Sequence, residues 1–215
     1  MTRIVATIAA VVWIGCACAD AHQLDEYLQA TRIGAARDRV IVDISLTPGV
    51  AIAARVFEAI DANGDHQLSA AEIDDYARRV LRGMTLSIDD RPLELTLTRA
   101  ECPSWDEMRE GLGTIRIEAQ TRGGTSDAGP HRIRFVNAHE PARSVYLVNA
   151  LVPTDPAVAI AAQRRDELQR GIDIDVTVAR SFPAAMWVIL ALTAGAAYRA
   201  YPNGTRRRLA RAARG

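Results

Sequence analysis

The sequence predicts a mainly β protein: an antiparallel, immunoglobulin-like β-sandwich with an inserted helix-loop-helix and a C-terminal transmembrane helix. From residue 24 onward, short segments alternate apolar and polar residues, and turn residues separate them. Over residues 50–83 this period of two gives way to helical spacing. Near the end of the chain, residues 182–198 form an uncharged apolar stretch.

The composition is that of a globular domain with accessory segments. The chain has 215 residues, of which 49% are hydrophobic. The formal net charge is zero, but residues 199–215 hold six arginines, so that the part between the two apolar ends is mildly acidic. This distribution does not suit a nucleic-acid-binding surface, and we expect no nucleic-acid partner.

The N-terminus has the pattern of a secretory signal peptide over residues 1–21. Arg3 provides the positive start, residues 4–15 the apolar run, and small residues allow cleavage after Ala19 or Ala21. Cys102 is then the only cysteine of the mature chain, so no intrachain disulfide can form. We therefore expect export, with an extracytoplasmic or periplasmic domain over residues 22–181.

The expected strands share short length and alternation of apolar with polar residues. They cover residues 24–33, 40–46, 84–88, 93–97, 114–119, 133–136 and 145–148. Residues 157–164 and 171–179 are interpreted as a further hairpin, with the charged run between them as its turn. A short helix before the last strand is the alternative, because that run also contains good helix formers.

Residues 182–198 are just long enough to span a membrane as a helix, since about 17 to 25 residues are needed. The basic tail, residues 199–215, would stay in the cytoplasm by the positive-inside rule and leave the sandwich on the other side. A buried C-terminal helix of a soluble protein is the alternative. The preferred interpretation is a domain anchored in the inner cell membrane.

The twelve residues from 61 to 72 place oxygen donors at the spacing that calcium requires. Calcium takes oxygen ligands, and a twelve-residue loop presents them from positions 1, 3, 5, 7, 9 and 12. Those positions hold Asp61, Asn63, Asp65, Gln67, Ser69 and Glu72. Gln67 would act through its backbone carbonyl, Ser69 through water, and Glu72 with both carboxylate oxygens. The stretch resembles an EF-hand calcium loop; an acidic turn that binds nothing is the alternative.

The residues around these ligands agree with the loop, with one departure. Apolar residues at helical spacing precede and follow it, and Leu68 can turn inward between the ligands. The sixth position, which is normally glycine because of its positive φ, holds His66. That conformation costs a non-glycine residue about 1–2 kcal/mol, so we expect modest affinity. The choice between calcium and magnesium stays open, and no second loop is found in the sequence.

Several stretches together resemble a group of uncharacterised bacterial exported proteins that carry an EF-hand. They are residues 21–31, 44–51, the loop itself and residues 144–150. The resemblance covers nearly all of the mature chain. It implies a secreted, calcium-loop-bearing β domain with a C-terminal membrane anchor, and it implies no activity.

Two other functions compete with calcium binding. Cleavage at either site would leave His22 at or near a free N-terminus, where nitrogen donors could bind Cu(II) or Ni(II). The domain could instead be an accessory protein that docks on a membrane protein such as a metal transporter. We expect no enzyme, because Cys102 shows no activating partner, and His131 and His139 are expected to be satisfied polar surface groups.

Overall fold

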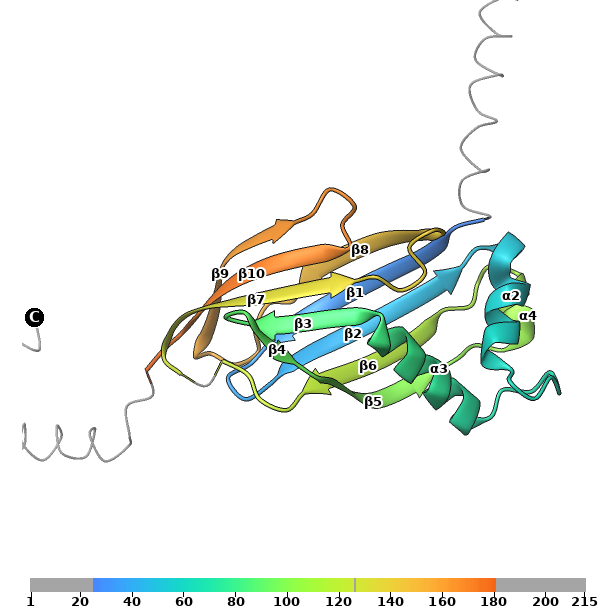
Figure 1. Cartoon of the computed structure of the whole chain (residues 1–215), viewed down its shortest axis with the longest axis horizontal. Helices are drawn as coiled ribbons and strands as arrows, with labels where there is room; N and C mark the ends of the chain where they lie inside the picture. Colours follow the sequence, from blue (N-terminus) through green and yellow to red (C-terminus); the bar gives the residue numbers. More distant parts are fainter. Residues whose placement is uncertain (1–24, 126, 181–215) are drawn as a thin grey trace, which may run out of the picture. The chain divides into compact units, whose positions relative to one another are not determined.

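The computed structural model describes residues 25–125 and 127–180, which form a mainly β, sandwich-like domain with few helices (Figure 1). The first five-stranded sheet has the order β5-β6-β2-β1-β8, and the second has the order β4-β3-β7-β10-β9. The strands are β1 (Tyr27–Ala35), β2 (Val40–Pro48), β3 (Met84–Ile88), β4 (Arg91–Leu93), β5 (Leu95–Glu101), β6 (Ile115–Thr121), β7 (Gly129–Asn137), β8 (Ser144–Ala150), β9 (Val158–Arg165) and β10 (Gly171–Val178). The helices are α2 (Val50–Ile60), α3 (Ala70–Arg82) and α4 (Trp105–Arg109).

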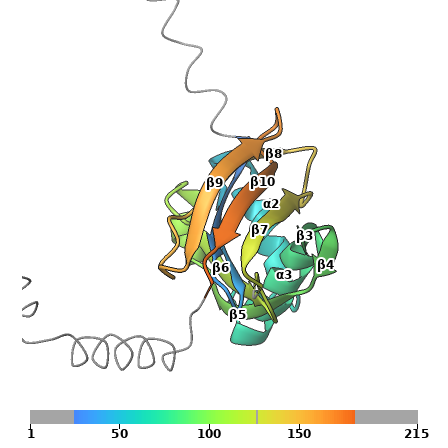
Figure 2. The same ribbon diagram turned by 90° about the vertical axis from the view of Figure 1, so that its left-hand side faces the viewer.

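Alternation along the strands builds the core between the two sheets. In β2, the residues Val40, Val42, Ile44 and Leu46 are all fully enclosed, whereas the residues between them are more exposed. The second sheet supplies Phe135 from β7, which has no exposed surface. The inward faces are therefore the ones that the sequence pattern predicts. Figure 2 views the sandwich from the end where β10 finishes.

One strand pair departs from the predicted antiparallel arrangement. β1 pairs with β2 antiparallel but with β8 parallel, so that Leu28 lies opposite Val145. The reason is that β7 belongs to the second sheet. The chain therefore enters β8 from the opposite sheet rather than through a hairpin, and it can run in the same direction as its neighbour.

The outer edge of β8 is covered by side chains of β9. The Nε of Arg165 donates a hydrogen bond to the backbone oxygen of Val148 at 2.6 Å. The backbone N–H of Ala150 donates to the side-chain oxygen of Gln163 at 3.4 Å. Backbone groups at the rim of the first sheet thus find partners without a further strand.

The expected strand over residues 93–97 is wrong in its boundaries, because two strands meet there. β4 lies in the second sheet and β5 in the first, so the chain changes sheets at Glu94. Asp89 and Asp90, which join β3 to β4, have φ values of 50° and 62°. Two successive residues with positive φ make a tight two-residue turn of the kind that joins adjacent antiparallel strands.

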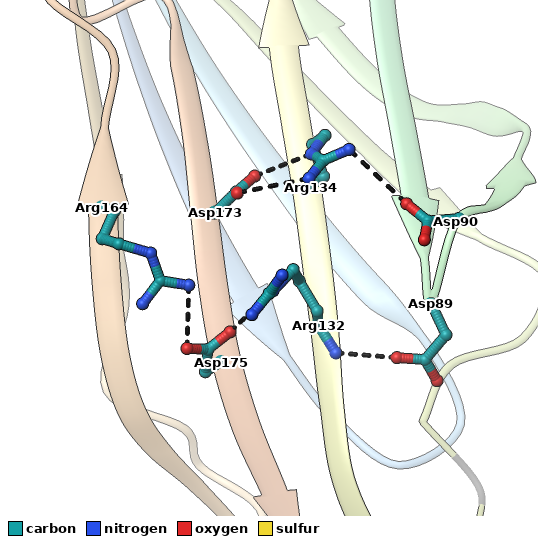
Figure 3. Close-up of polar contacts among 7 residues, drawn as sticks. All are labelled: Asp89, Asp90, Arg132, Arg134, Arg164, Asp173 and Asp175. Carbon is teal, nitrogen blue, oxygen red and sulfur yellow. Dashed lines mark hydrogen bonds and ion pairs between the residues drawn. The ribbon is translucent and has the colours of Figure 1, made fainter.

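The hairpin of β9 and β10 is confirmed, with the charged run as its connection. The outer face of β10 carries ion pairs to its neighbours (Figure 3). Arg134 faces Asp173 across the β7–β10 ladder, with 2.9 Å between Nε and the carboxylate, and Arg132 faces Asp175 at the same distance. The arginines of these pairs are exposed and the aspartates are partly exposed, so each pair contributes little stability. Opposite charges directly across a ladder still favour this register.

Three predicted segments lie outside the described residues: the signal peptide (1–21), the membrane helix (182–198) and the basic tail (199–215). Within residues 25–125 and 127–180, no helix has the length and apolar character needed to cross a bilayer.

Candidate functional site

The helix-loop-helix lies where the sequence predicts it, with α2 and α3 on either side of residues 61–69. Both helices bury one face, which includes Phe57 on α2 and Tyr76 on α3. At the end of α2, the N–H of Asp61 donates to the carbonyl of Phe57 at 2.9 Å. Ser69 and Glu72 form a capping box that begins α3. Asp61 and Ser69 therefore each belong both to a helix end and to the loop.

Asp61 is the centre of the loop. Its carboxylate accepts hydrogen bonds from three successive backbone N–H groups, those of Gly64 at 2.8 Å, Asp65 at 3.2 Å and His66 at 2.9 Å. Asp61 is only 8% exposed, whereas the four residues that follow it are exposed. The backbone consequently curls around this carboxylate.

The side chains at loop positions three and five fold toward the same backbone. The side-chain oxygen of Asn63 accepts a hydrogen bond from the N–H of Asp65 at 2.8 Å. One carboxylate oxygen of Asp65 accepts from the N–H of Gln67 at 2.8 Å, and the other accepts from the Asn63 side-chain amide at 3.1 Å. Three of the predicted ligands are thus joined in one hydrogen-bonded turn.

Glu72 connects the two ends of the loop. Its Oε1 accepts from the N–H groups of Ala62 at 2.9 Å and Asn63 at 3.3 Å. Its Oε2 accepts from the N–H of Ser69 at 2.9 Å and from the Ser69 hydroxyl at 2.7 Å. These hydrogen bonds, with those from Ser69 the strongest, lower the pKa of Glu72. The side chain is therefore ionised at neutral pH and closes the loop.

The two residues singled out between the ligands behave as predicted. His66 has a φ of 61°, the left-handed conformation expected at the sixth position. Leu68 is half-buried and packs against the core. The local backbone thus follows the expected loop in spite of the missing glycine.

The acidic side chains of the loop do not lie together as a group of three metal ligands. No three His, Cys, Asp or Glu side chains among residues 25–125 and 127–180 lie close enough together to hold a metal ion. Gln67 contributes only its N–H to the turn, and the Ser69 hydroxyl is used in the capping box. His22 lies outside the described residues.

The two histidines expected at the surface differ from each other. His131 is paired as expected: one ring nitrogen lies 2.7 Å from the carboxylate of Asp89 and the other 2.8 Å from the backbone oxygen of Asp127. The hydrogen bond with Asp89 raises the pKa of His131. For His139 the expectation is wrong, because it is only 9% exposed, and burial lowers its pKa.

The sequence gives no sign of the aromatic cluster around His139. The hydroxyls of Tyr27 and Tyr76 lie 2.7 Å apart, and each tyrosine ring has its centre 6.2 Å from that of His139. Burial raises the pKa of Tyr76 to about 12. Burial also raises the pKa of the Cys102 thiol to about 12, so this thiol is protonated at neutral pH.

The chain has no match among family models, among curated proteins or among solved structures.

Proposed function

We propose that residues 61–72 bind a calcium ion in the manner of an EF-hand loop. The observation that carries this proposal is the Asp61 carboxylate with its three backbone N–H donors, since these turn loop positions four to six around one point. The positive φ of His66 supports it, because the EF-hand loop needs its sharp turn at that position.

The residues fit calcium in kind and number. Asp61, Asn63 and Asp65 would hold the ion through side-chain oxygens, Gln67 through its backbone carbonyl, Ser69 through water and Glu72 through both carboxylate oxygens. Glu72 would have to exchange some of its present hydrogen bonds for the ion. A divalent cation would neutralise most of the charge of the three carboxylates, which are the hard oxygen donors that calcium prefers.

We expect a weak and structural site. A single loop with a non-glycine sixth residue suggests the range of about 10⁻⁴–10⁻³ M that extracellular modules show. At calcium concentrations ten- to a hundredfold above Kd, binding would add about 1–3 kcal/mol to the free energy of unfolding. A role in fold stability thus accounts for the site better than signalling does.

We propose that this domain is exported and anchored in the membrane, and that its two sheets pack against each other as in an immunoglobulin-like sandwich. The signal-like residues 1–21 and the apolar residues 182–198 with their basic tail support the location. Two mainly antiparallel sheets packed face to face support the architecture. A binding domain rather than an enzyme is the class that these features favour.

The test is the calcium dependence of the melting temperature for the full-length chain and its Glu72→Gln variant. The wild-type temperature should rise on addition of millimolar calcium, and the variant should not respond. Glu107→Gln is the matched control, since Glu107 forms the same capping box with Ser104 at the start of α4, away from the loop. An equal calcium response in both variants and the wild type would reject the site. Titration with magnesium in the same assay decides the ion preference.

A further inference from the structure

A cavity of about 170 Å³ lies where α2 and α3 meet the sandwich. Its lining combines buried aromatic rings with exposed arginines. The principal lining residues are Tyr27, Arg55, Tyr76, Arg79, His139 and Arg143. The three rings are nearly enclosed, whereas the three arginines are exposed, so the rings form the floor and the guanidinium groups stand at the mouth.

His139 at the floor has an imidazole with no hydrogen-bond partner in the described part of the chain, and its Nε2 is completely enclosed. The residue is held through its backbone instead. Its N–H donates to the side-chain oxygen of Asn137 at 2.9 Å, and its carbonyl accepts from Gln29 at 2.9 Å and from the Tyr146 hydroxyl at 2.7 Å. Because buried polar groups are normally paired, this unpaired ring indicates a missing partner.

The two tyrosines leave a second donor unused. In the contact between the hydroxyls of Tyr27 and Tyr76, only one hydroxyl hydrogen lies between the two oxygens. The other hydrogen has no acceptor among the residues that the structure describes. The floor therefore offers an O–H donor and an imidazole to whatever enters the cavity.

The mouth carries an excess of positive charge. Arg55 and Arg143 form no ion pair with any residue in the described ranges. Arg79 lies over the Tyr76 ring, 5.7 Å from its centre, and its Nη1 donates a hydrogen bond to the backbone oxygen of Ala59 at 3.1 Å. Glu140 is the only acidic residue of the lining. Unused hydrogen-bond donors at the floor, and three guanidinium groups against one carboxylate at the mouth, are complementary to an acceptor with negative charge.

We propose that this cavity binds a small oxyanion, a phosphate or a small carboxylate. The volume corresponds to about six water molecules at roughly 30 Å³ each, which admits an ion of that size. Guanidinium groups bind its oxygens at the mouth, and the free tyrosine hydroxyl donates from the floor. His139 donates through its Nδ1, because its Nε2 is enclosed. This site is separate from the calcium loop, although α2 and α3 contribute to both.

The test is calorimetric titration of the full-length chain with inorganic phosphate, and separately with malonate, up to about 10 mM at constant ionic strength. EDTA is present throughout, so that the result is independent of the calcium proposal. The wild type should bind at least one of the two ions saturably. The ion that binds more tightly shows whether the cavity prefers a phosphate or a carboxylate. Arg55→Gln should weaken binding about tenfold, the value of one charge-assisted hydrogen bond. Arg82→Gln is the control, since Arg82 is exposed at the end of α3 and outside this cavity.

His139→Phe should abolish binding while the melting temperature without anion stays the same or rises, because an unpaired polar ring is replaced by an apolar one of similar size. A structural role for His139 would instead lower that temperature. The proposal is overturned if neither ion binds, if Arg82→Gln weakens binding as much as Arg55→Gln does, or if His139→Phe binds normally.

Discussion

Replacing His66 with glycine should stabilise the domain. His66 adopts a φ of 61°, which costs a residue with a Cβ about 1–2 kcal/mol. Glycine avoids this cost but loses about 0.5–1 kcal/mol more conformational entropy on folding. The balance is a gain of about 0.5–1 kcal/mol in the free energy of unfolding, which corresponds to about 1–4 °C in melting temperature for a domain of this size.

The assay is thermal unfolding in EDTA, with His66→Ala as the matched control. The imidazole is exposed and makes no hydrogen bond within the described residues, so its removal alone should matter little. Alanine keeps the Cβ and therefore the strain, and its melting temperature should equal that of the wild type or fall below it. If alanine stabilises the protein as much as glycine does, the effect comes from the lost ring and the strain argument is wrong.

Three further predictions concern the sandwich and its histidines. The folded state lowers the pKa of His139 below its ordinary value of 6.5, so the stability linked to this group is present above pH 6.5 and is lost as pH falls through the lowered pKa. The folded state raises the pKa of His131, so the stability linked to that group is present below pH 6.5 and is lost as pH rises through the raised pKa. Urea unfolding from about pH 5 to 8 should therefore show less acid destabilisation in His139→Phe and less alkaline destabilisation in His131→Asn, and unchanged profiles would contradict both assignments. Ser104→Ala should cost about 1 kcal/mol by removing the α4 cap, and no change in the urea midpoint would show that this cap contributes nothing to stability. Phe135→Ala should cost about 3–5 kcal/mol in the same assay, whereas a loss below about 1 kcal/mol would mean that the core does not close around β7.

The backbone turn of the loop at His66 was predictable because its determinants are local. Asp61, His66 and Glu72 lie within twelve residues, so ligand spacing, the positive φ and the hydrogen-bonded turn all follow from one short stretch. Most strands were predictable for a similar reason, since alternation along a single segment shows which side chains face the core.

Alternation along a segment could not show which of the two sheets each strand joins. The alternation of residues 93–97 is the same whether the chain stays in one sheet or changes sheets at Glu94. The burial of His139 is also a long-range effect, because Gln29, more than a hundred positions away, holds its backbone. The short helix α4 did have a local signal, the Ser104–Glu107 capping box, which marks a helix start in the sequence.

The covered rim of β8 has a consequence for the protein at high local concentration. Val145 and Leu147 are 40% and 41% exposed on this outermost strand, and a bare rim beside such residues would let a second molecule continue the sheet. Arg165 and Gln163 occupy part of the backbone that such an addition would use. They therefore hinder edge-to-edge pairing between molecules, and removing both side chains should make the domain more prone to aggregation through this strand.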